Sequence, residues 1–221
     1  MKIFLDTANI EEIKKYNDMG LVDGITTNPS LLAKEGIAPK KQMAEICKIV
    51  KGDISLEVVS TEYDGMIEEG KRLREYGEHV VVKCPMTPDG LKACKSLTSG
   101  GIPVNVTLCF SPSQAVLAAK AGARYVSPFV GRLDDIGEDG MELIEEIKQI
   151  YSHYDFHTQI LVASIRNLDH VVKSAKIGAD VGTMPPSILG EMLKHPLTDK
   201  GLKNFLADWE QFVSENPDFQ F

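Results

Sequence analysis

The sequence of 221 residues is poor in cysteine and has no long apolar run. None of its four cysteines belongs to a C-x-x-C pair, so we expect reduced thiols rather than a disulfide framework. The first apolar stretch is only a few residues long and meets Asp6 at once. We therefore expect no signal peptide, no membrane-spanning segment and a cytoplasmic location.

The sequence also has fewer basic than acidic residues. Lys and Arg number 24 against 32 Asp and Glu, which gives a formal net charge of −8. This balance argues against a general affinity for nucleic acid or anionic membranes. A small anionic ligand would need a local cluster of basic groups. His153 and His157 have a spacing that could bind a metal on a helix, but they lack patterned acidic partners, so we predict two solvated histidines and no metal site.

Short apolar runs alternate with longer helical patterns through most of the chain. A continuous run such as Val80-Val81-Val82 is typical of a parallel strand buried on both faces. The candidate strands are Lys2–Asp6, Gly24–Thr26, Ile54–Val58, His79–Lys83, Pro103–Thr107, Tyr125–Ser127, Gln159–Ala163 and Asp180–Gly182. The intervening helices carry start signals at Asn9, Thr87 and Ser111.

Regular alternation of strands and helices leaves two architectures, a doubly wound sheet or a barrel. No G-x-G-x-x-G motif follows the first strand, which weakens the dinucleotide-binding alternative. Eight units in this length favour a single (β/α)₈ TIM barrel, with residues 1–221 as one domain.

An additional helix at about residues 198–215 follows the eighth unit. One face of it is apolar and contains Leu202, Phe205, Leu206, Trp209 and Phe212. This face could close the flank of the barrel or pack on a neighbouring subunit. The sequence gives no placement for Phe219 and Phe221 in the tail.

Polar residues collect where the predicted strands end. Active sites of these barrels lie at the carboxyl ends of the strands. The residues that gather there are Asp6, Thr26, Thr27, Asn28, Glu57, Lys83, Asn105, Thr107, Ser127, Arg132, Ser164 and Arg166. Each alone has a structural explanation, such as a helix cap or a solvated lysine. The joint pattern is far more specific than its members and predicts one active site.

Lys83 is the unusual member of this set because it ends a buried strand. Burial disfavours the charged form of an amine, and only a neutral amine attacks a carbonyl to form a Schiff base. The alternative is a buried ion pair with Glu57. The two interpretations are compatible, since such a pair could also move protons.

The remaining residues suggest a division of tasks. Asp6 and Glu57 could move the protons of imine formation and of carbon–carbon cleavage, and Thr107 could hold the water. Asn28 and Asn105 could bind sugar hydroxyls. Arg132 and Arg166, with Ser164, could bind a phosphate. Alternatively, either arginine could pair with Asp134, Asp135 or Asp169.

Together these segments resemble the small transaldolases, relatives of fructose-6-phosphate aldolase among the class I aldolase barrels. The matching segments are FLDTA, GITTNPSLL, LEVV, VVVKCP, NVTLCF, SPFVGRLDD and VASIRN, which run almost end to end. TTNPS and SPFVGR are quite specific, whereas VVVKCP alone would be weak.

The resemblance implies roles residue by residue. Lys83 would form the Schiff base, Asp6 would be the acid/base of carbon–carbon cleavage, and Glu57 and Thr107 would activate the catalytic water. Sugar contacts would come from Thr26, Asn28, Asn105, Ser127 and Phe129, and phosphate contacts from Arg132, Ser164 and Arg166. It implies no metal or organic cofactor. It also implies a ring-shaped homo-oligomer, a pentamer or decamer, whose C-terminal helix reaches a neighbour.

Two positions bear on which relative the chain resembles. The aldolase-type members have glutamine at the position of Glu57 and tyrosine at that of Phe129, so both residues favour a transaldolase. The alternatives are a fructose-6-phosphate aldolase, a sugar-phosphate-binding barrel without catalysis, and a proton-transfer isomerase that uses Glu57 as its base.

Overall fold

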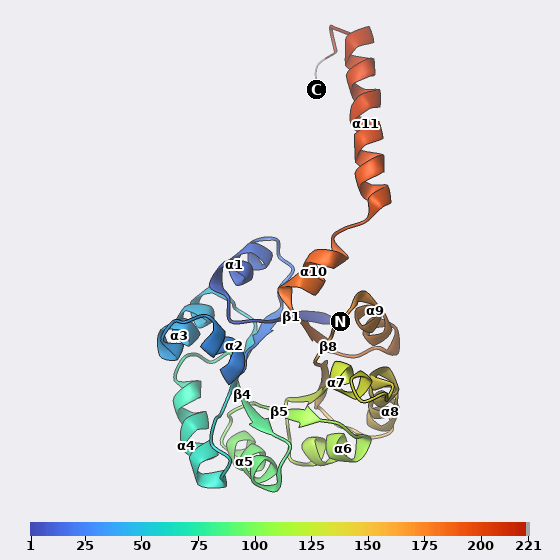
Figure 1. Cartoon of the computed structure of the whole chain (residues 1–221). Helices are drawn as coiled ribbons and strands as arrows, with labels where there is room; N and C mark the ends of the chain where they lie inside the picture. The colour runs from blue at the N-terminus through green and yellow to red at the C-terminus, as the bar shows by residue number, and fades with distance from the viewer. Residues whose placement is uncertain (220–221) are drawn as a thin grey trace. The chain divides into compact units, whose positions relative to one another are not determined.

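The computed structural model describes residues 1–219, which form two compact units. The first, Met1–Pro186, is a closed barrel of eight parallel strands with helices between them (Figure 1). The strands are β1 (Lys2–Asp6), β2 (Gly24–Thr26), β3 (Asp53–Glu57), β4 (Val80–Pro85), β5 (Val104–Cys109), β6 (Tyr125–Pro128), β7 (Gln159–Val162) and β8 (Val181–Met184). The predicted (β/α)₈ barrel is confirmed, while the prediction that the chain is one domain stays a prediction.

The barrel closes where β1 pairs with β8. Phe4 of β1 lies opposite Thr183, and Leu5 lies opposite Met184. The sequence prediction ended this last strand at Gly182 and was wrong by two residues, because pairing with β1 continues through Thr183 and Met184. This extension brings the Thr183 side chain to the carboxyl end of the barrel.

Most of the helices lie between successive strands. They are α1 (Ile10–Asp18), α2 (Pro29–Lys34), α3 (Pro39–Ile49), α4 (Tyr63–Arg74), α5 (Pro88–Ser99), α6 (Pro112–Lys120), α7 (Val130–Asp134), α8 (Gly140–Ser152), α9 (Leu168–Ile177), α10 (Pro186–Met192) and α11 (Pro196–Glu215). The predicted caps are confirmed: side chains of Asn9, Thr87 and Ser111 accept backbone N–H groups of α1, α5 and α6.

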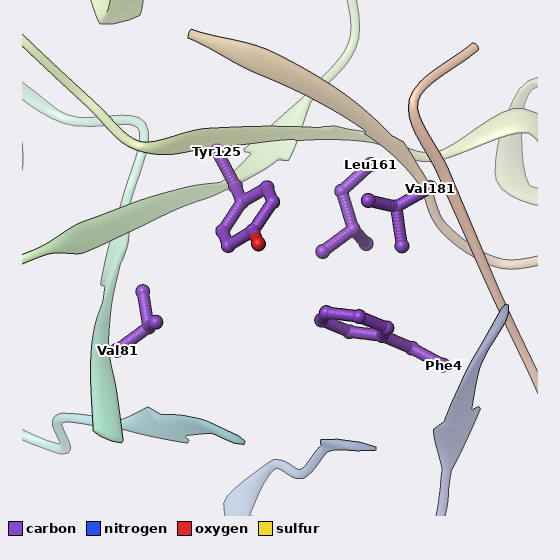
Figure 2. Packing of buried hydrophobic residues seen from close by; sticks show 5 residues of the cluster. All are labelled: Phe4, Val81, Tyr125, Leu161 and Val181. Carbon is purple, nitrogen blue, oxygen red and sulfur yellow. The ribbon is translucent and has the colours of Figure 1, made fainter. Parts of the chain in front are cut away.

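The interior of the barrel is filled by Phe4, Val81, Tyr125, Leu161 and Val181, which come from five strands and point toward one another (Figure 2). Gly24 makes room for this layer, because a Cβ there would lie 2.5 Å from the Phe4 ring. Residues two apart on a strand share a face. The next inward residues on these strands are therefore Asp6, Lys83, Ser127, Ala163 and Thr183, and all five line one cavity.

The second unit begins at Ser187 and contains the long helix α11. The helix starts two residues before the predicted boundary, because Pro196 occupies its first turn and His195 caps it. It has no buried residue. Phe219 packs edge-on against Trp209 and Phe212, whereas Phe221 lies outside the described residues. Within residues 1–219, no helix has the length and apolar character needed to span a membrane.

Candidate active site

A cavity of about 210 Å³ lies at the carboxyl ends of the strands. Its lining contains the predicted site residues except Thr27, Glu57 and Asn105, and adds Ala163 and Thr183. The lining residues are Asp6, Thr26, Asn28, Lys83, Thr107, Ser127, Phe129, Arg132, Ala163, Ser164, Arg166 and Thr183. A larger groove of about 660 Å³ beside α2, α3 and α4 is mainly apolar and includes Glu57 but not Lys83. The smaller cavity therefore contains three of the four predicted catalytic residues, Asp6, Lys83 and Thr107.

Lys83 is buried, with 5% of its surface exposed, and its Nζ lies 2.9 Å from Oε2 of Glu57. The two residues are direct partners in the pairing of β3 with β4, which brings their side chains together. The ion pair that the sequence left open is thus present. Glu57 lies where it can take a proton from the amine and return one.

Asp6 lies on the strand at which the barrel closes. Its Oδ1 accepts a 2.8 Å hydrogen bond from Oγ1 of Thr26, while Oδ2 accepts none from residues 1–219. Loss of hydration on burial raises the pKa of Asp6 above 3.8, and the Thr26 hydrogen bond and the Lys83 charge oppose that shift. One carboxylate oxygen is therefore fixed and the other is available to a ligand.

Two polar side chains keep hydrogen-bonding capacity at the cavity. The buried hydroxyl of Thr107 has no hydrogen bond to any described residue. Asn28 uses Oδ1 to cap α2 through Leu31 N at 2.9 Å, which leaves its Nδ2 group without a partner among residues 1–219. Both can bind a water molecule or a ligand hydroxyl.

Asn105 lies outside the cavity lining and is fully buried. Its Nδ2 donates to Oγ of Ser55 at 3.1 Å, and its Oδ1 accepts from Oγ of Ser127 at 2.8 Å. Its predicted contact with a sugar stays a prediction; in this structure it orients Ser127, which does line the cavity. Sequence reasoning missed Ser55, although its position two residues before Glu57 places it on the same strand face.

The basic residues lie together at one side of the cavity. Arg132 comes from α7, and its guanidinium lies 4.8 Å from the Phe129 ring without a carboxylate partner in residues 1–219. Arg166, in the loop between β7 and α9, makes two hydrogen bonds to Asp135 at 3.1 and 2.7 Å. Of the alternative ion pairs, only Arg166–Asp135 is present among the described residues, since Asp134 pairs with His170 and Asp169 with Lys173.

The loop that carries Ser164 and Arg166 is held from two sides. Ser164 has φ of 59°, a left-handed conformation that is costly for a residue other than glycine, and its carbonyl accepts the N–H of Gly131 at 3.1 Å. Buried His170 accepts the Arg166 N–H at Nδ1 and contacts Asp134 through Nε2 at 2.8 Å. Sequence reasoning missed His170, which follows the VASIRN segment on the first turn of α9.

The cavity thus combines an amine, the carboxylate of Asp6, free hydroxyl and amide groups, and two guanidinium groups. The carboxylate of Glu57 pairs with the amine from outside the lining. An amine beside a carboxylate can form an imine with a carbonyl compound. The guanidinium groups can bind an anionic group of the same compound.

Comparison with known proteins agrees with this chemistry. The model of the transaldolase/fructose-6-phosphate aldolase family matches residues 3–216. A probable transaldolase of Nitrosopumilus maritimus is 69% identical over the full length of both chains, and one of Aquifex aeolicus is 61% identical over 98% of this chain and 100% of its own. A thiamine phosphate pyrophosphorylase from Pyrococcus furiosus shares the fold alone, with a TM-score of 0.58 and 16% identity over 86% of this chain and 87% of its own. The chain belongs to the transaldolase/fructose-6-phosphate aldolase family.

Proposed function

We propose that the protein is a transaldolase that uses Lys83 as its Schiff-base lysine. It would transfer a dihydroxyacetone unit from sedoheptulose 7-phosphate to glyceraldehyde 3-phosphate, giving erythrose 4-phosphate and fructose 6-phosphate. The observation that carries this proposal is that buried Lys83, paired with Glu57, lines a cavity together with Asp6 and two arginines. The names of the relatives support the same activity.

The first half of the reaction forms the imine. Glu57 takes a proton from the Lys83 ammonium, and the neutral amine attacks the ketose carbonyl. The carbonyl oxygen takes a proton from the attacking nitrogen and becomes the carbinolamine hydroxyl. Glu57 then returns its proton to this hydroxyl, which leaves as water while the nitrogen lone pair forms the iminium bond. Thr107, whose hydroxyl has no partner among residues 1–219, holds that water.

The second half breaks and remakes a carbon–carbon bond. Asp6 takes the proton of the C4 hydroxyl, the C3–C4 bond breaks, and its electron pair neutralises the iminium to give an enamine. The enamine carbon then attacks the acceptor aldehyde, and Asp6 returns the proton to the new alkoxide. The raised pKa of Asp6 suits a group that must both accept and donate this proton.

The arginines bind the phosphate in this proposal. Arg132 has no carboxylate partner among the described residues, so it can bind the dianion directly. Arg166 must share its guanidinium between Asp135 and the phosphate or release Asp135. Ser164 adds a hydroxyl. Sugar hydroxyls would contact Thr26, Asn28 and Ser127, and Phe129 would provide an apolar wall.

Phe129 also bears on the choice between transfer and free release. Its ring packs against Phe110 and under the Arg132 guanidinium, and it has no hydroxyl with which to activate water. Poor release of the three-carbon enamine favours its capture by an aldehyde. The family also contains fructose-6-phosphate aldolases, so release of free dihydroxyacetone is the second candidate function.

Helix α11 supports a further proposal, that the protein forms a homo-oligomer. Leu202, Phe205 and Leu206 are 59%, 73% and 55% exposed. An apolar face of this kind is typical of an interaction surface. We propose that it packs on another copy of the chain.

Borohydride reduction tests the central proposal. Incubation with fructose 6-phosphate and borohydride should add a reduced three-carbon or six-carbon unit to Lys83, detected by peptide mass spectrometry. Lys83→Met should abolish the adduct, whereas Lys71→Met, a change at an exposed lysine of α4, should leave it. An unmodified Lys83 in the wild type would exclude a Schiff-base enzyme and leave the isomerase or the non-catalytic barrel.

The same preparation distinguishes transfer from release. With glyceraldehyde 3-phosphate as acceptor, sedoheptulose 7-phosphate should be consumed and erythrose 4-phosphate should appear. Without an acceptor, little free dihydroxyacetone should form. Equal consumption of the ketose in both conditions would identify an aldolase.

A further inference from the structure

We propose that Thr183 is a positioning residue for Asp6 and that it acts through the hydroxyl of Thr26. The inference rests on the proposed role of Asp6 in carbon–carbon cleavage. Thr183 lies on β8 and has no hydrogen bond to Asp6 among the described residues. The Thr26 side chain of β2 connects the two.

Three neighbouring strands contribute one residue each to this arrangement. Asp6 lies on β1, Thr26 on β2 and Thr183 on β8, and β1 is paired with both of the others. The two threonine hydroxyl oxygens are 2.7 Å apart, and Oγ1 of Thr26 is 2.8 Å from Oδ1 of Asp6. Both threonines are only 3% exposed, and all three residues line the cavity.

The direction of these hydrogen bonds follows from the number of hydrogens. An ionised carboxylate only accepts, so the single hydroxyl hydrogen of Thr26 is donated to Asp6. Thr26 then has only lone pairs to offer Thr183, and Thr183 must be the donor of the 2.7 Å bond. The order of donation is therefore Thr183 to Thr26 to Asp6.

This order has a chemical consequence at Asp6. A hydroxyl that accepts a hydrogen bond becomes a stronger donor, because the chain of bonds polarises each member. Thr183 thus strengthens the bond that fixes Oδ1 and favours the ionised carboxylate, which is the form that removes a proton. It also prevents the Thr26 hydroxyl from rotating away, so that Oδ2 keeps its orientation toward the substrate.

We expect the charged groups around Asp6 to stay in place when Thr183 is changed. Lys83 approaches from β4 with Glu57 paired to it from β3, and Arg132 and Arg166 line the same cavity. None of them has a hydrogen bond to Thr183. A change in the pH dependence of a Thr183 variant can therefore be attributed to the hydroxyl chain.

The test is Thr183→Val, which removes the hydroxyl and keeps the shape. We expect kcat of the transfer reaction to fall roughly 5- to 20-fold, as for loss of a polarising hydrogen bond. The acidic limb of the kcat profile should move to higher pH, with KM nearly unchanged. Borohydride trapping on Lys83 should persist, because imine formation uses Glu57. Thr183→Ser should restore both kcat and the profile.

Thr158→Val is the matched control. Thr158 is also a buried threonine, and its hydroxyl donates to the Ala123 carbonyl. It lies just before β7, at the opposite end of that strand from the cavity. The Thr158→Val change should leave the pH profile unchanged. Thermal unfolding checks that each variant is folded, and Thr183→Ala replaces the valine variant where that one does not fold.

Two results would overturn this inference and leave the proposed function intact. One is a folded Thr183→Val enzyme with the wild-type kcat and profile. The other is failure of the serine variant to restore them, which would show that the methyl group matters rather than the hydroxyl. Absence of a Lys83 adduct in the wild type would overturn the proposed function itself, and this inference with it.

Discussion

Asp6 is a carboxylate whose ionised form is less well solvated in the folded protein than in the unfolded chain. Its pKa is raised above 3.8 because burial removes water, and the Thr26 hydrogen bond and the Lys83 charge only partly compensate. The native state therefore binds the proton of Asp6 more tightly than the unfolded state does. Stability falls as pH rises from 3.8 through the raised pKa, and it stays lower above that range.

We therefore expect Asp6→Asn to raise the midpoint of thermal unfolding at neutral pH. The amide carries no charge to desolvate and can still accept the Thr26 hydrogen bond. The gain should vanish below about pH 3.8, where both states of the wild type are protonated. Transfer activity should fall by roughly 10²- to 10⁴-fold, the usual contribution of an acid/base group.

Calorimetry across the pH range checks this expectation. The exposed residue Asp155 supplies the control, since Asp155→Asn should change neither stability nor activity. A lower unfolding midpoint for Asp6→Asn at neutral pH would show that the Lys83 interaction outweighs the loss of hydration.

For single residues, the sequence predicted which side chains line the cavity better than it predicted their contacts. Alternation along strands was sufficient to bring Asp6, Lys83 and Thr107 to one cavity. It could not show that the Asn105 amide would hydrogen-bond to Ser55 and Ser127 outside the cavity lining. Hydrogen bonds of this kind depend on the register of several strands in the barrel, which no local pattern encodes.

At the scale of secondary-structure elements, α7 and the loop between β7 and α9 lie in close contact at the site. A Cβ on Gly131 would lie 2.3 Å from the carbonyl oxygen of Ser164 and 2.6 Å from Cγ of Arg166. The N–H of Gly131 also donates to that carbonyl. The position of the basic residues thus depends on a backbone contact that only glycine permits.

Gly131→Ala should therefore displace Ser164 and Arg166 and weaken phosphate binding. We expect KM for phosphorylated ketoses to rise about 10-fold or more, as when a charge-assisted contact is lost. Trapping of unphosphorylated dihydroxyacetone on Lys83 should be nearly unchanged. Steady-state kinetics and borohydride trapping measure the two effects.

Gly100→Ala provides the comparison. Gly100 is the C-cap of α5, and a Cβ there would meet its nearest atoms at 3.4 and 3.6 Å, which is ordinary contact. The Gly100→Ala change should leave KM for phosphorylated ketoses unchanged. Equal effects of Gly131→Ala on phosphorylated and unphosphorylated ligands would argue against a specific role for this contact.

Element boundaries show where sequence patterns lose information. Caps at Asn9, Thr87 and Ser111 were predictable, since a side chain and its N–H partner lie three residues apart. The end of β8 was not, because Thr183 and Met184 belong to the strand only through pairing with β1. Because this pairing is long-range, the sequence patterns did not place Thr183 in the site, although the Thr183–Thr26–Asp6 hydrogen bonds begin there.

For the whole molecule, a net charge of −8 coexists with two arginines at one cavity. The field of the protein would not attract the proposed sugar phosphates from a distance, so in our proposal Arg132 and Arg166 bind them locally. The other feature at this scale is the exposed apolar face of α11, which the helical spacing of the sequence predicted and which we propose packs on another copy of the chain.

Light scattering tests the homo-oligomer. The wild type should have a mass several times the 24.3 kDa of one chain. Phe205→Glu, at a side chain that is 73% exposed, should lower that mass because a buried charge at an interface is costly. Asn204→Glu makes the same change of charge one residue away, off the apolar face, and should keep the mass. A monomeric wild type would contradict the proposal.

The bond between Thr26 and Thr183 joins residues 157 positions apart in the chain. Helices and adjacent strand pairs can form from local segments, but this bond requires β8 to meet β1 and complete the ring. Asp6, the proposed general base, would consequently reach its working geometry only after the last strand is in place. During refolding, we expect the helical signal to return before Asp6 is oriented, and a chain interrupted before β8 would contain Lys83 and Glu57 without a correctly oriented Asp6.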